Sequence, residues 1–168
     1  MRSVMLDIET LGNNSKSVII SLGAVEFDEN GLGREFYMNV DPKSCILAGL
    51  QMDADTVMWW MQQSDAARSI FKNKAEPLED VLHEFKQWFP KDALVWGNGA
   101  TFDNVIVDNA YRAANMNKPW KYNADRCYRT LKALYPHIKP IERLGTHHNA
   151  LDDAKYQALH AIEIMKVS

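Results

Sequence analysis

Two carboxylates stand two positions apart near the start of the chain. Asp7 and Glu9 directly follow the short apolar run Val4-Met5-Leu6. Such a run predicts a strand, and residues two apart in a strand point to the same face. Asp7 and Glu9 would therefore repel each other, and each would raise the pKa of the other. A bound cation would offset this repulsion; the alternative is a pair of solvated charges at a strand end.

Two further carboxylates, each on a predicted helix, are placed to join this pair. On a helix in the second half of the chain, Asp103 borders the apolar stripe, whereas Asp108 faces the opposite side. On the last helix, Asp153 lies at the edge of the apolar stripe and Asp152 lies on the far side. Helical geometry favours Asp103 and Asp153 as the residues that turn toward the sheet. For Asp103, the alternative is an acid that complements the helix dipole.

A histidine completes the set of residues that could carry out chemistry. His148 immediately precedes the last helix and would line the same cleft as Asp153, whereas the adjacent His147 would point elsewhere. Carboxylate oxygens suit hard ions such as Mg²⁺ or Mn²⁺, and two ions about 3.5–4 Å apart suit displacement at phosphorus. A neutral imidazole can take the proton from an attacking water. Zinc is disfavoured, because neither cysteine lies near these residues.

The elements that must position these residues follow the order βββ-α-β-α-β-α. Strands are predicted over residues 3–8, 17–28, 35–40, 93–96 and 123–125. Helices are predicted as short pieces over 43–73, then over 77–89 and 102–114, up to 135, and over 149–166. An Asn-Gly turn joins the second and third strands, and the apolar fourth strand favours a parallel position. The fold class is α/β: an antiparallel meander followed by parallel strands in a mixed five-stranded sheet, flanked by helices, in one domain over residues 1–168.

Composition and charge narrow the classes of function. No run approaches the roughly 18 apolar residues of a membrane span, no signal-peptide pattern opens the chain, and the two cysteines form no C-x-x-C. We therefore expect a cytoplasmic protein without a membrane partner. The net charge is −3, yet residues 112–143 hold eight basic and two acidic side chains. This segment favours an anionic ligand beside the carboxylates, with a solvated basic face as the alternative.

Three motifs in this order resemble those of the DEDDh 3′–5′ exonucleases. They are Asp7-x-Glu9-Thr10, Asn98-x-x-x-Phe102-Asp103 and the histidine motif of residues 148–153. This family has an RNase H-like fold and includes proofreading exonucleases, RNase T and oligoribonuclease. The resemblance covers nearly the whole chain and is nearest to the phage DexA-type and RNase T-like exonucleases. One departure is Gly97, where many relatives place a histidine.

The resemblance implies a role for each matching residue. It implies two divalent cations, Mg²⁺ or Mn²⁺, held by the four carboxylates Asp7, Glu9, Asp103 and Asp153, with His148 as general base. Thr10 and Leu11 would lie at the 3′ end of the substrate, with Leu11 wedged near the terminal base. Asn98 and Phe102 of the middle motif would lie beside the substrate and support the ligands.

Aromatic and basic side chains supply further candidates for substrate binding. Trp59 and Trp60 lie on a predicted helix, where adjacent residues diverge by about 100°, so one would pack and the other would be exposed. We favour Trp60 as the residue that stacks on a base, a contact worth about 1–3 kcal/mol, with core packing as the alternative. Arg126 and Arg129, with Tyr128, would bind phosphates further along the strand or simply be solvated on a helix.

The sequence thus predicts a metal-dependent 3′–5′ exonuclease that hydrolyses single-stranded DNA or RNA from the 3′ end to nucleoside 5′-monophosphates. A nucleic-acid-binding module without catalysis and a phosphodiesterase for very short oligonucleotides are the alternatives. No residue can be assigned to a 2′-hydroxyl, so DNA and RNA are not distinguished, although the phage-type resemblance favours DNA. Because several relatives in the family are homodimers, we expect a homodimer.

Overall fold

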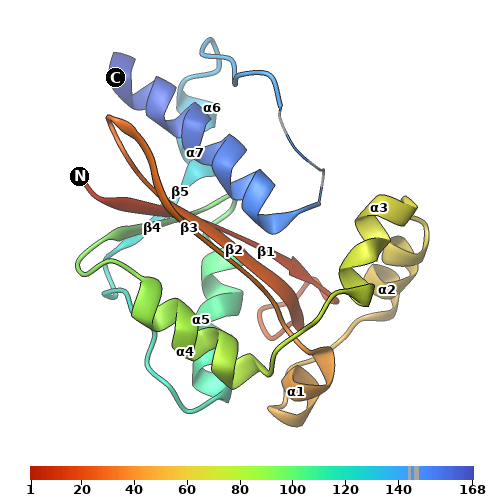
Figure 1. Cartoon of the computed structure of the whole chain (residues 1–168). Helices are drawn as coiled ribbons and strands as arrows, with labels where there is room; N and C mark the ends of the chain where they lie inside the picture. The colour runs from red at the N-terminus through yellow and green to blue at the C-terminus, as the bar shows by residue number, and fades with distance from the viewer. Residues whose placement is uncertain (144, 146–147) are drawn as a thin grey trace.

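A mixed five-stranded sheet forms the centre of the molecule (Figure 1). The computed structural model describes residues 1–143, 145 and 148–168. The strands are β1 (Ser3–Thr10), β2 (Ile19–Asp28), β3 (Gly31–Asn39), β4 (Leu94–Gly97) and β5 (Asp125–Cys127), in the order β3-β2-β1-β4-β5. β1, β2 and β3 pair antiparallel, whereas β4 pairs parallel with β1 and with β5. The predicted α/β fold class is confirmed.

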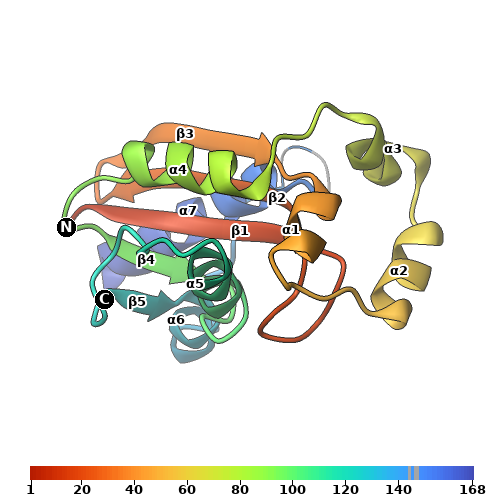
Figure 2. The same cartoon turned by 90° about the horizontal axis from the view of Figure 1, so that it is seen from below.

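Helices cover both faces of this sheet. They are α1 (Pro42–Leu47), α2 (Ala54–Met61), α3 (Asp65–Arg68), the 3₁₀ helix η1 (Ser69–Lys72), α4 (Leu78–Trp88), α5 (Asp103–Ala113), α6 (Tyr128–Leu134) and α7 (Ala150–Val167). α6 and α7 lie on one face, and α4 and α5 lie on the other (Figure 2). α1, α2 and α3 lie beyond the carboxyl end of β1, where the two views agree in showing them.

The alternation of side chains along β1 divides the core into two parts. Val4, Leu6 and Ile8 are buried in the larger hydrophobic cluster, which includes residues of α4 and α5. Met5 is buried in the second cluster with residues of α6 and α7. Because side chains alternate in a strand, Asp7 and Glu9 continue the row of Met5 on the α7 face. Ile8, between the two carboxylates in sequence, is buried on the opposite face of the strand.

A glycine allows α7 to approach the sheet closely. Gly23 of β2 pairs with Asp7 of β1. A Cβ atom at Gly23 would lie 2.3 Å from the backbone nitrogen of Leu151 and 2.4 Å from the carbonyl carbon of Ala150. The first turn of α7 therefore rests directly on β2, beside Asp7. Glycine inside a strand is typical of such a close backbone approach.

Several strand boundaries differ from those predicted. β1 continues to Thr10 because β2 runs beside it as far as the pair Thr10 and Ile19. β3 begins at Gly31, directly after the turn, rather than at residue 35. β5 spans Asp125–Cys127, two residues later than predicted, where it meets β4. Each boundary is set by a partner strand, which the local sequence pattern does not contain.

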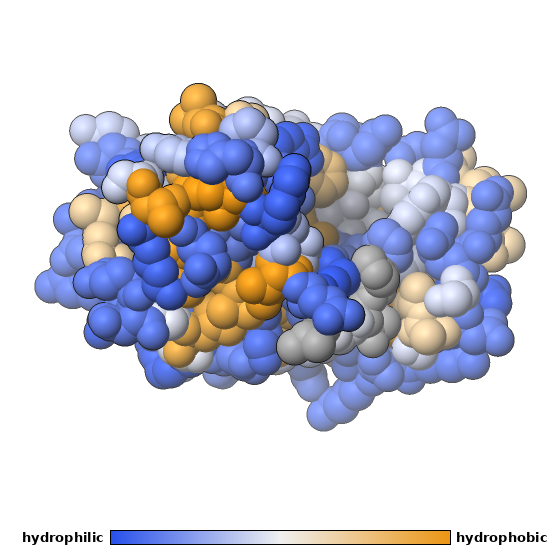
Figure 3. All heavy atoms as spheres, turned by 90° about the horizontal axis from the view of Figure 1, so that it is seen from above, coloured by the Kyte–Doolittle hydropathy of each residue, from blue (hydrophilic) through white to orange (hydrophobic). Residues whose placement is uncertain are grey.

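The surface varies in polarity from one face to another. On the face that carries α6 and α7, groups of hydrophobic residues lie among hydrophilic ones over the part of the molecule that α7 covers (Figure 3).

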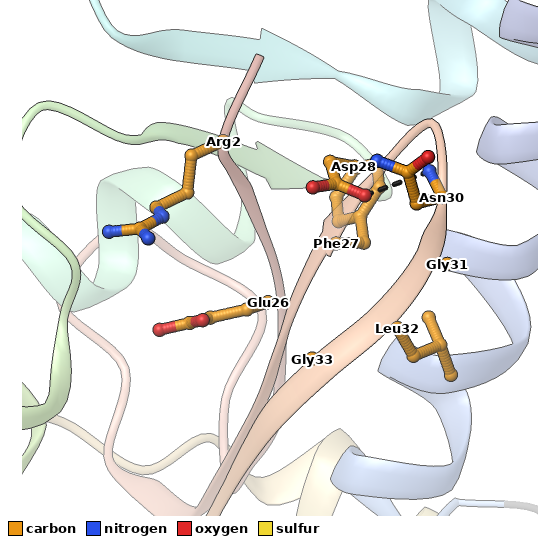
Figure 4. Close-up of a pocket in the computed structure, with 8 residues that line it drawn as sticks. All are labelled: Arg2, Glu26, Phe27, Asp28, Asn30, Gly31, Leu32 and Gly33. Atoms are coloured by element: carbon orange, nitrogen blue, oxygen red, sulfur yellow. Dashed lines mark hydrogen bonds between the residues drawn. The ribbon is translucent and has the colours of Figure 1, made fainter.

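At the end of the sheet opposite to Asp7 and Glu9, the β2–β3 hairpin borders a cavity of about 210 Å³ (Figure 4). There the Asp28 carboxylate accepts a hydrogen bond of 2.8 Å from the Asn30 backbone nitrogen. Among the described residues, no helix has the length and apolar character needed to cross a membrane.

Candidate active site

Three carboxylates from two elements meet at the carboxyl end of β1. Asp7 and Glu9 come from β1, and Asp153 comes from the first turn of α7. One oxygen of each lies within 4.8 Å of an oxygen of the others. The strand period brings the first two together, and the approach of α7 at Gly23 brings the third. The three residues thus form a compact set of oxygen ligands.

Burial and repulsion shift the pKa values of these carboxyl groups. The pKa of Asp7 is raised well above its ordinary value by burial and then by the charges of Asp103, Glu9 and Asp153. Burial, followed by the charges of Asp153 and Asp103, raises the pKa of Glu9 to about 9. Both shifts arise from negative charge gathered away from water. A divalent cation would relieve both causes, and the donor set of carboxylate oxygens fits Mg²⁺ or Mn²⁺.

The fourth predicted carboxylate, Asp103, borders this set. Asp103 is 4% exposed, whereas Asp108 pairs with Lys118 at 2.9 Å, so Asp103 is the one of the two that turns inward. Burial raises the pKa of Asp103 to about 7, and hydrogen bonds with the backbone of Ile8 limit the rise. Asp103 lies outside the group within 4.8 Å, yet its charge acts on both Asp7 and Glu9.

Two polar side chains that sequence reasoning left out contact the carboxylates. Gln157 is 6% exposed, and its Nε2 donates to Asp7 Oδ1 at 3.1 Å. It lies one turn after Asp153 on α7, and this spacing of four residues is the signal that marks it. Arg143 forms an ion pair with Asp153. It belongs to the basic segment, but no pattern distinguished it from its neighbours.

A cavity of about 280 Å³ opens in front of these groups. The residues that line it are Asp7, Asn98, Tyr128, Lys132, Arg143, His148, Asp153, Tyr156 and Gln157. The set combines carboxylates, an imidazole and two basic side chains. Such a cavity suits a charged substrate whose negative groups are offset by cations.

His148 is the residue that precedes the N-cap of α7, and it lines this cavity. Asn149 is the N-cap, and its Oδ1 accepts a hydrogen bond of 3.0 Å from the Asp152 backbone nitrogen. His148 is exposed and has a φ of 61°, in the left-handed region that few residues other than glycine adopt. The predicted orientation of His147 lies outside the described residues. His148 lines the same cavity as Asp7 and Asp153.

The residues after Glu9 are buried at the end of β1. Thr10 is 8% exposed and Leu11 is 7% exposed. The Thr10 hydroxyl donates to the Gly12 carbonyl at 2.6 Å. Phe102 is half-buried and packs against the larger core cluster. These three side chains border the site mainly through packing.

The exposure of the two tryptophans is opposite to that predicted. Trp60 is 3% exposed, and its Nε1 donates to the Thr10 carbonyl at 2.9 Å, whereas Trp59 is 41% exposed. The ring of Trp60 also packs against Phe71 at a centroid distance of 5.3 Å. The prediction that Trp60 is the exposed base-stacking residue is therefore wrong. Its indole faces are buried, and only Trp59 of the pair offers a surface to a ligand.

The two arginines expected to bind phosphates lie at the margin of the site. Arg126 Nη1 donates to the carbonyls of Asn123 and Asp125, both at 2.9 Å, and Arg126 does not line the cavity. Arg129 is exposed, and its Nη2 donates to the Asn98 carbonyl at 2.8 Å. Among the residues that the structure describes, the basic side chains that line the cavity itself are Lys132 and Arg143.

The chain is similar to proteins that process nucleic acids. A family model described as a 3′-5′ exoribonuclease Rv2179c-like domain matches residues 2–165. The chain is 28% identical to the PolC-type DNA polymerase III of Listeria monocytogenes, over 96% of this chain and 11% of the polymerase. It is also 28% identical to an exodeoxyribonuclease of Enterobacteria phage T4, over 94% of this chain and 65% of the phage protein. The chain thus spans only a part of these curated relatives.

Solved structures share the fold. The nuclease domain of 3′hExo, a DEDDh family member bound to rAMP, matches with a TM-score of 0.68 and 13% identity, over 99% of this chain and 92% of that domain. E. coli exonuclease I in complex with a dT13 oligonucleotide matches with a TM-score of 0.67 and 17% identity, over 98% of this chain and 40% of that protein. The predicted RNase H-like arrangement is therefore confirmed.

Proposed function

Because the chain belongs to the family of Rv2179c-like 3′-5′ exoribonuclease domains, we propose that it removes nucleotides one at a time from the 3′ end of single-stranded nucleic acid. The products are nucleoside 5′-monophosphates. One observation carries this proposal: oxygens of Asp7, Glu9 and Asp153 lie within 4.8 Å of one another beside a cavity that His148 also lines. Cation ligands together with a general base suit the hydrolysis of a phosphodiester.

Four carboxylates would hold two divalent cations, Mg²⁺ or Mn²⁺. Asp7, Glu9 and Asp153 supply the close set of oxygens, and Asp103 completes it from the first turn of α5. When bound, these ions stabilise negative charge on the attacking and leaving oxygens. Gln157 holds the Asp7 carboxylate in place through its hydrogen bond to Oδ1. The four acids therefore act as ligands, which leaves the proton transfer to another group.

His148 is that group in this proposal. Its imidazole takes a proton from water as the water oxygen attacks the terminal phosphorus, and the bond from phosphorus to the 3′ oxygen of the preceding nucleotide breaks. The leaving 3′ oxygen becomes a hydroxyl by taking a proton from solvent. The exposed position of His148 supports this role, because solvent can then reset its protonation state.

The 3′ end of the substrate is held at the carboxyl end of β1. Thr10 and Leu11 form the seat of the terminal nucleotide, beside Asn98 and Phe102 of the middle motif. The exposed indole of Trp59 offers an aromatic surface for a base. The cations of Lys132 and Arg143 bind phosphates within the cavity, and Arg129 and Arg126 lie further out along the strand.

RNA is the substrate that the family description favours. The matching model is described as an exoribonuclease domain, whereas the phage relative is named an exodeoxyribonuclease. The model spans residues 2–165, so we place RNA first and DNA second, reversing the preference that the motifs alone suggested. A homodimer, expected from the family resemblance, and a cytoplasmic location stay predictions that gel filtration and cell fractionation would check.

Digestion of matched RNA and DNA oligonucleotides tests this function. Each oligonucleotide carries a 5′ label or a 3′ label and is incubated with Mn²⁺, with Mg²⁺ or with EDTA. We expect a ladder that shortens by single nucleotides from 5′-labelled substrate, immediate release of the label from 3′-labelled substrate, and no reaction in EDTA. Binding without degradation would favour a binding module instead. Cleavage of dinucleotides alone would favour a small-substrate phosphodiesterase.

A further inference from the structure

The exposed tryptophan of α2 is in direct ring contact with the candidate general base. The rings of Trp59 and His148 have centroids 5.0 Å apart and an interplanar angle of 90°, the edge-to-face arrangement that aromatic pairs prefer. Trp60 adds a second edge-to-face contact with His148, with a centroid distance of 6.5 Å and an interplanar angle of 71°. Two side chains of one short helix thus contact a residue that lies far along the chain.

That helix is itself fixed to the end of β1. Trp60 Nε1 donates to the Thr10 carbonyl at 2.9 Å, and the backbone nitrogen of Asp53, the N-cap of α2, donates to the Leu11 carbonyl at 2.9 Å. Both acceptors directly follow Asp7 and Glu9 in sequence. α2 therefore fixes the two indole rings that contact His148 relative to the carboxylates of β1 and to Thr10 and Leu11.

His148 stands between two cavities, so the direction of its ring matters. One cavity, of about 280 Å³, contains Asp7 and Asp153, and the other, of about 250 Å³, is lined by Tyr37 and Ile70. The backbone of His148 has a φ of 61°, and its side chain is exposed. An exposed imidazole populates several rotamers unless neighbouring groups restrain it. A general base acts only from the rotamer that reaches the attacking water.

We infer that Trp59 is a positioning residue for His148. Its edge-to-face contact holds the imidazole toward the cavity that contains Asp7 and Asp153, where the 3′ end would lie beside Thr10 and Leu11. This inference rests on the proposed function of His148. It gives Trp59 a second role beside base stacking, since one part of the indole contacts the imidazole while 41% of the residue is exposed. Stacking would strengthen substrate binding, whereas positioning would raise kcat.

A double-mutant cycle separates the two roles. Trp59→Ala should lower kcat for a short oligonucleotide about threefold to tenfold, and Trp59→Phe, which keeps an aromatic ring, should restore most of the loss. In a His148→Ala background, Trp59→Ala should lower the residual rate by less than about twofold, because the group that it positions is gone. An equal loss of kcat in both backgrounds, or a change confined to KM, would overturn the positioning role.

A spectroscopic readout makes the test independent of activity. The Cε1–H resonance of His148, assigned by its loss in His148→Ala, should be displaced by the ring current of Trp59. It should move toward the position of an exposed histidine in Trp59→Ala and stay in place in the matched control Met61→Ala, which changes another exposed side chain of α2. Thermal unfolding checks that all variants fold. An inactive wild type would overturn the proposed function, whereas an active wild type whose resonance is unmoved in Trp59→Ala would overturn the positioning role alone.

Discussion

At the scale of single residues, the pKa of Glu9 makes stability depend on pH. Its pKa is about 9 in the folded, metal-free protein, against an ordinary value of 4.5. Between pH 4.5 and 9 the folded state therefore holds a proton that the unfolded state has released, so raising the pH favours unfolding. We expect the metal-free protein to lose about 2.5 kcal/mol of unfolding free energy between pH 6 and 8. Denaturant titrations in EDTA at several pH values measure the unfolding free energy, and Glu9→Gln should reduce the slope of that free energy against pH. Equal slopes in the two proteins would contradict the assignment.

Asp7 should limit the stability of the metal-free protein for the same electrostatic reason. Asp7→Asn keeps the shape of the side chain and removes a carboxyl group whose charged form is disfavoured by burial and by the neighbouring carboxylates. We expect it to raise the melting temperature in EDTA by about 3–6 °C, equivalent to about 1–2 kcal/mol. Mn²⁺ should raise the melting temperature of the wild type and leave that of Asp7→Asn almost unchanged. Calorimetry with and without Mn²⁺ provides the measurement, and equal stabilisation of both proteins by Mn²⁺ would count against the metal site.

Residue types and helical spacing predicted most of the acidic site. Periodicity separated Asp103 from Asp108 because a helix face follows from sequence alone. The choice between Trp59 and Trp60 failed because it depends on the Thr10 carbonyl, 50 positions away, which accepts the Trp60 indole hydrogen. Gln157 was missed for a related reason, since its partner Asp7 lies on a different element.

At the scale of elements, the contact of α7 with β2 depends on Gly23. A Cβ there would meet backbone atoms of Ala150 and Leu151, which cannot rotate away as a side chain can. Gly23→Ala should therefore destabilise the protein by about 1–3 kcal/mol and lower nuclease activity by shifting Asp153 away from Asp7. The matched control is Gly33→Ala in β3, whose new Cβ would lie 3.2 Å from the Glu26 side chain. Melting temperatures and cleavage rates check both variants, and a fully active Gly23→Ala would contradict this account of the site.

α6 and α7 are joined by a buried hydrogen-bond chain. His160 Nε2 lies 2.8 Å from the Ile138 carbonyl, which can only accept, so Nδ1 accepts from the Tyr128 hydroxyl at 2.7 Å. Tyr128→Phe would leave this buried nitrogen without its donor, and we expect a loss of about 1–2 kcal/mol. Tyr122→Phe, at a residue that is 90% exposed, should change stability by much less. Urea unfolding distinguishes the two variants, and equal stability of both would show that the buried hydrogen bonds of His160 contribute little to stability.

The type and order of the strands and helices could be predicted from the sequence, but the residues at which they begin and end were predicted less well. Alternation and helical periodicity identified the five strands and the long helices. The ends of β1, β3 and β5 were missed, because partner strands determine where pairing stops. Gly23 carried a readable signal, a glycine within a β-branched strand, but its meaning depends on which helix packs there.

At the scale of the whole molecule, the fold brings distant motifs to one end of the sheet. β1 supplies two acids, the β4–α5 turn leads to the third, and α7 supplies the fourth together with the preceding histidine. The parallel pairing of β1 with β4 places the carboxyl ends of both strands at the same edge, where ligands bind in open α/β sheets. The order of elements predicted this convergence, whereas the docking of α2 onto Thr10 and Leu11 had no counterpart in the sequence pattern.

We propose that this end of the sheet is a metal-dependent site that hydrolyses 3′ ends. The most direct measurement follows a 5′-labelled single-stranded RNA during a Mn²⁺ titration, with the wild type and Asp153→Asn at matched concentrations. We expect stepwise shortening from the 3′ end that rises with Mn²⁺ in the wild type and is abolished in the variant. Shortening that persists in Asp153→Asn at the wild-type rate, or a wild type that leaves the RNA intact at saturating Mn²⁺, would contradict it.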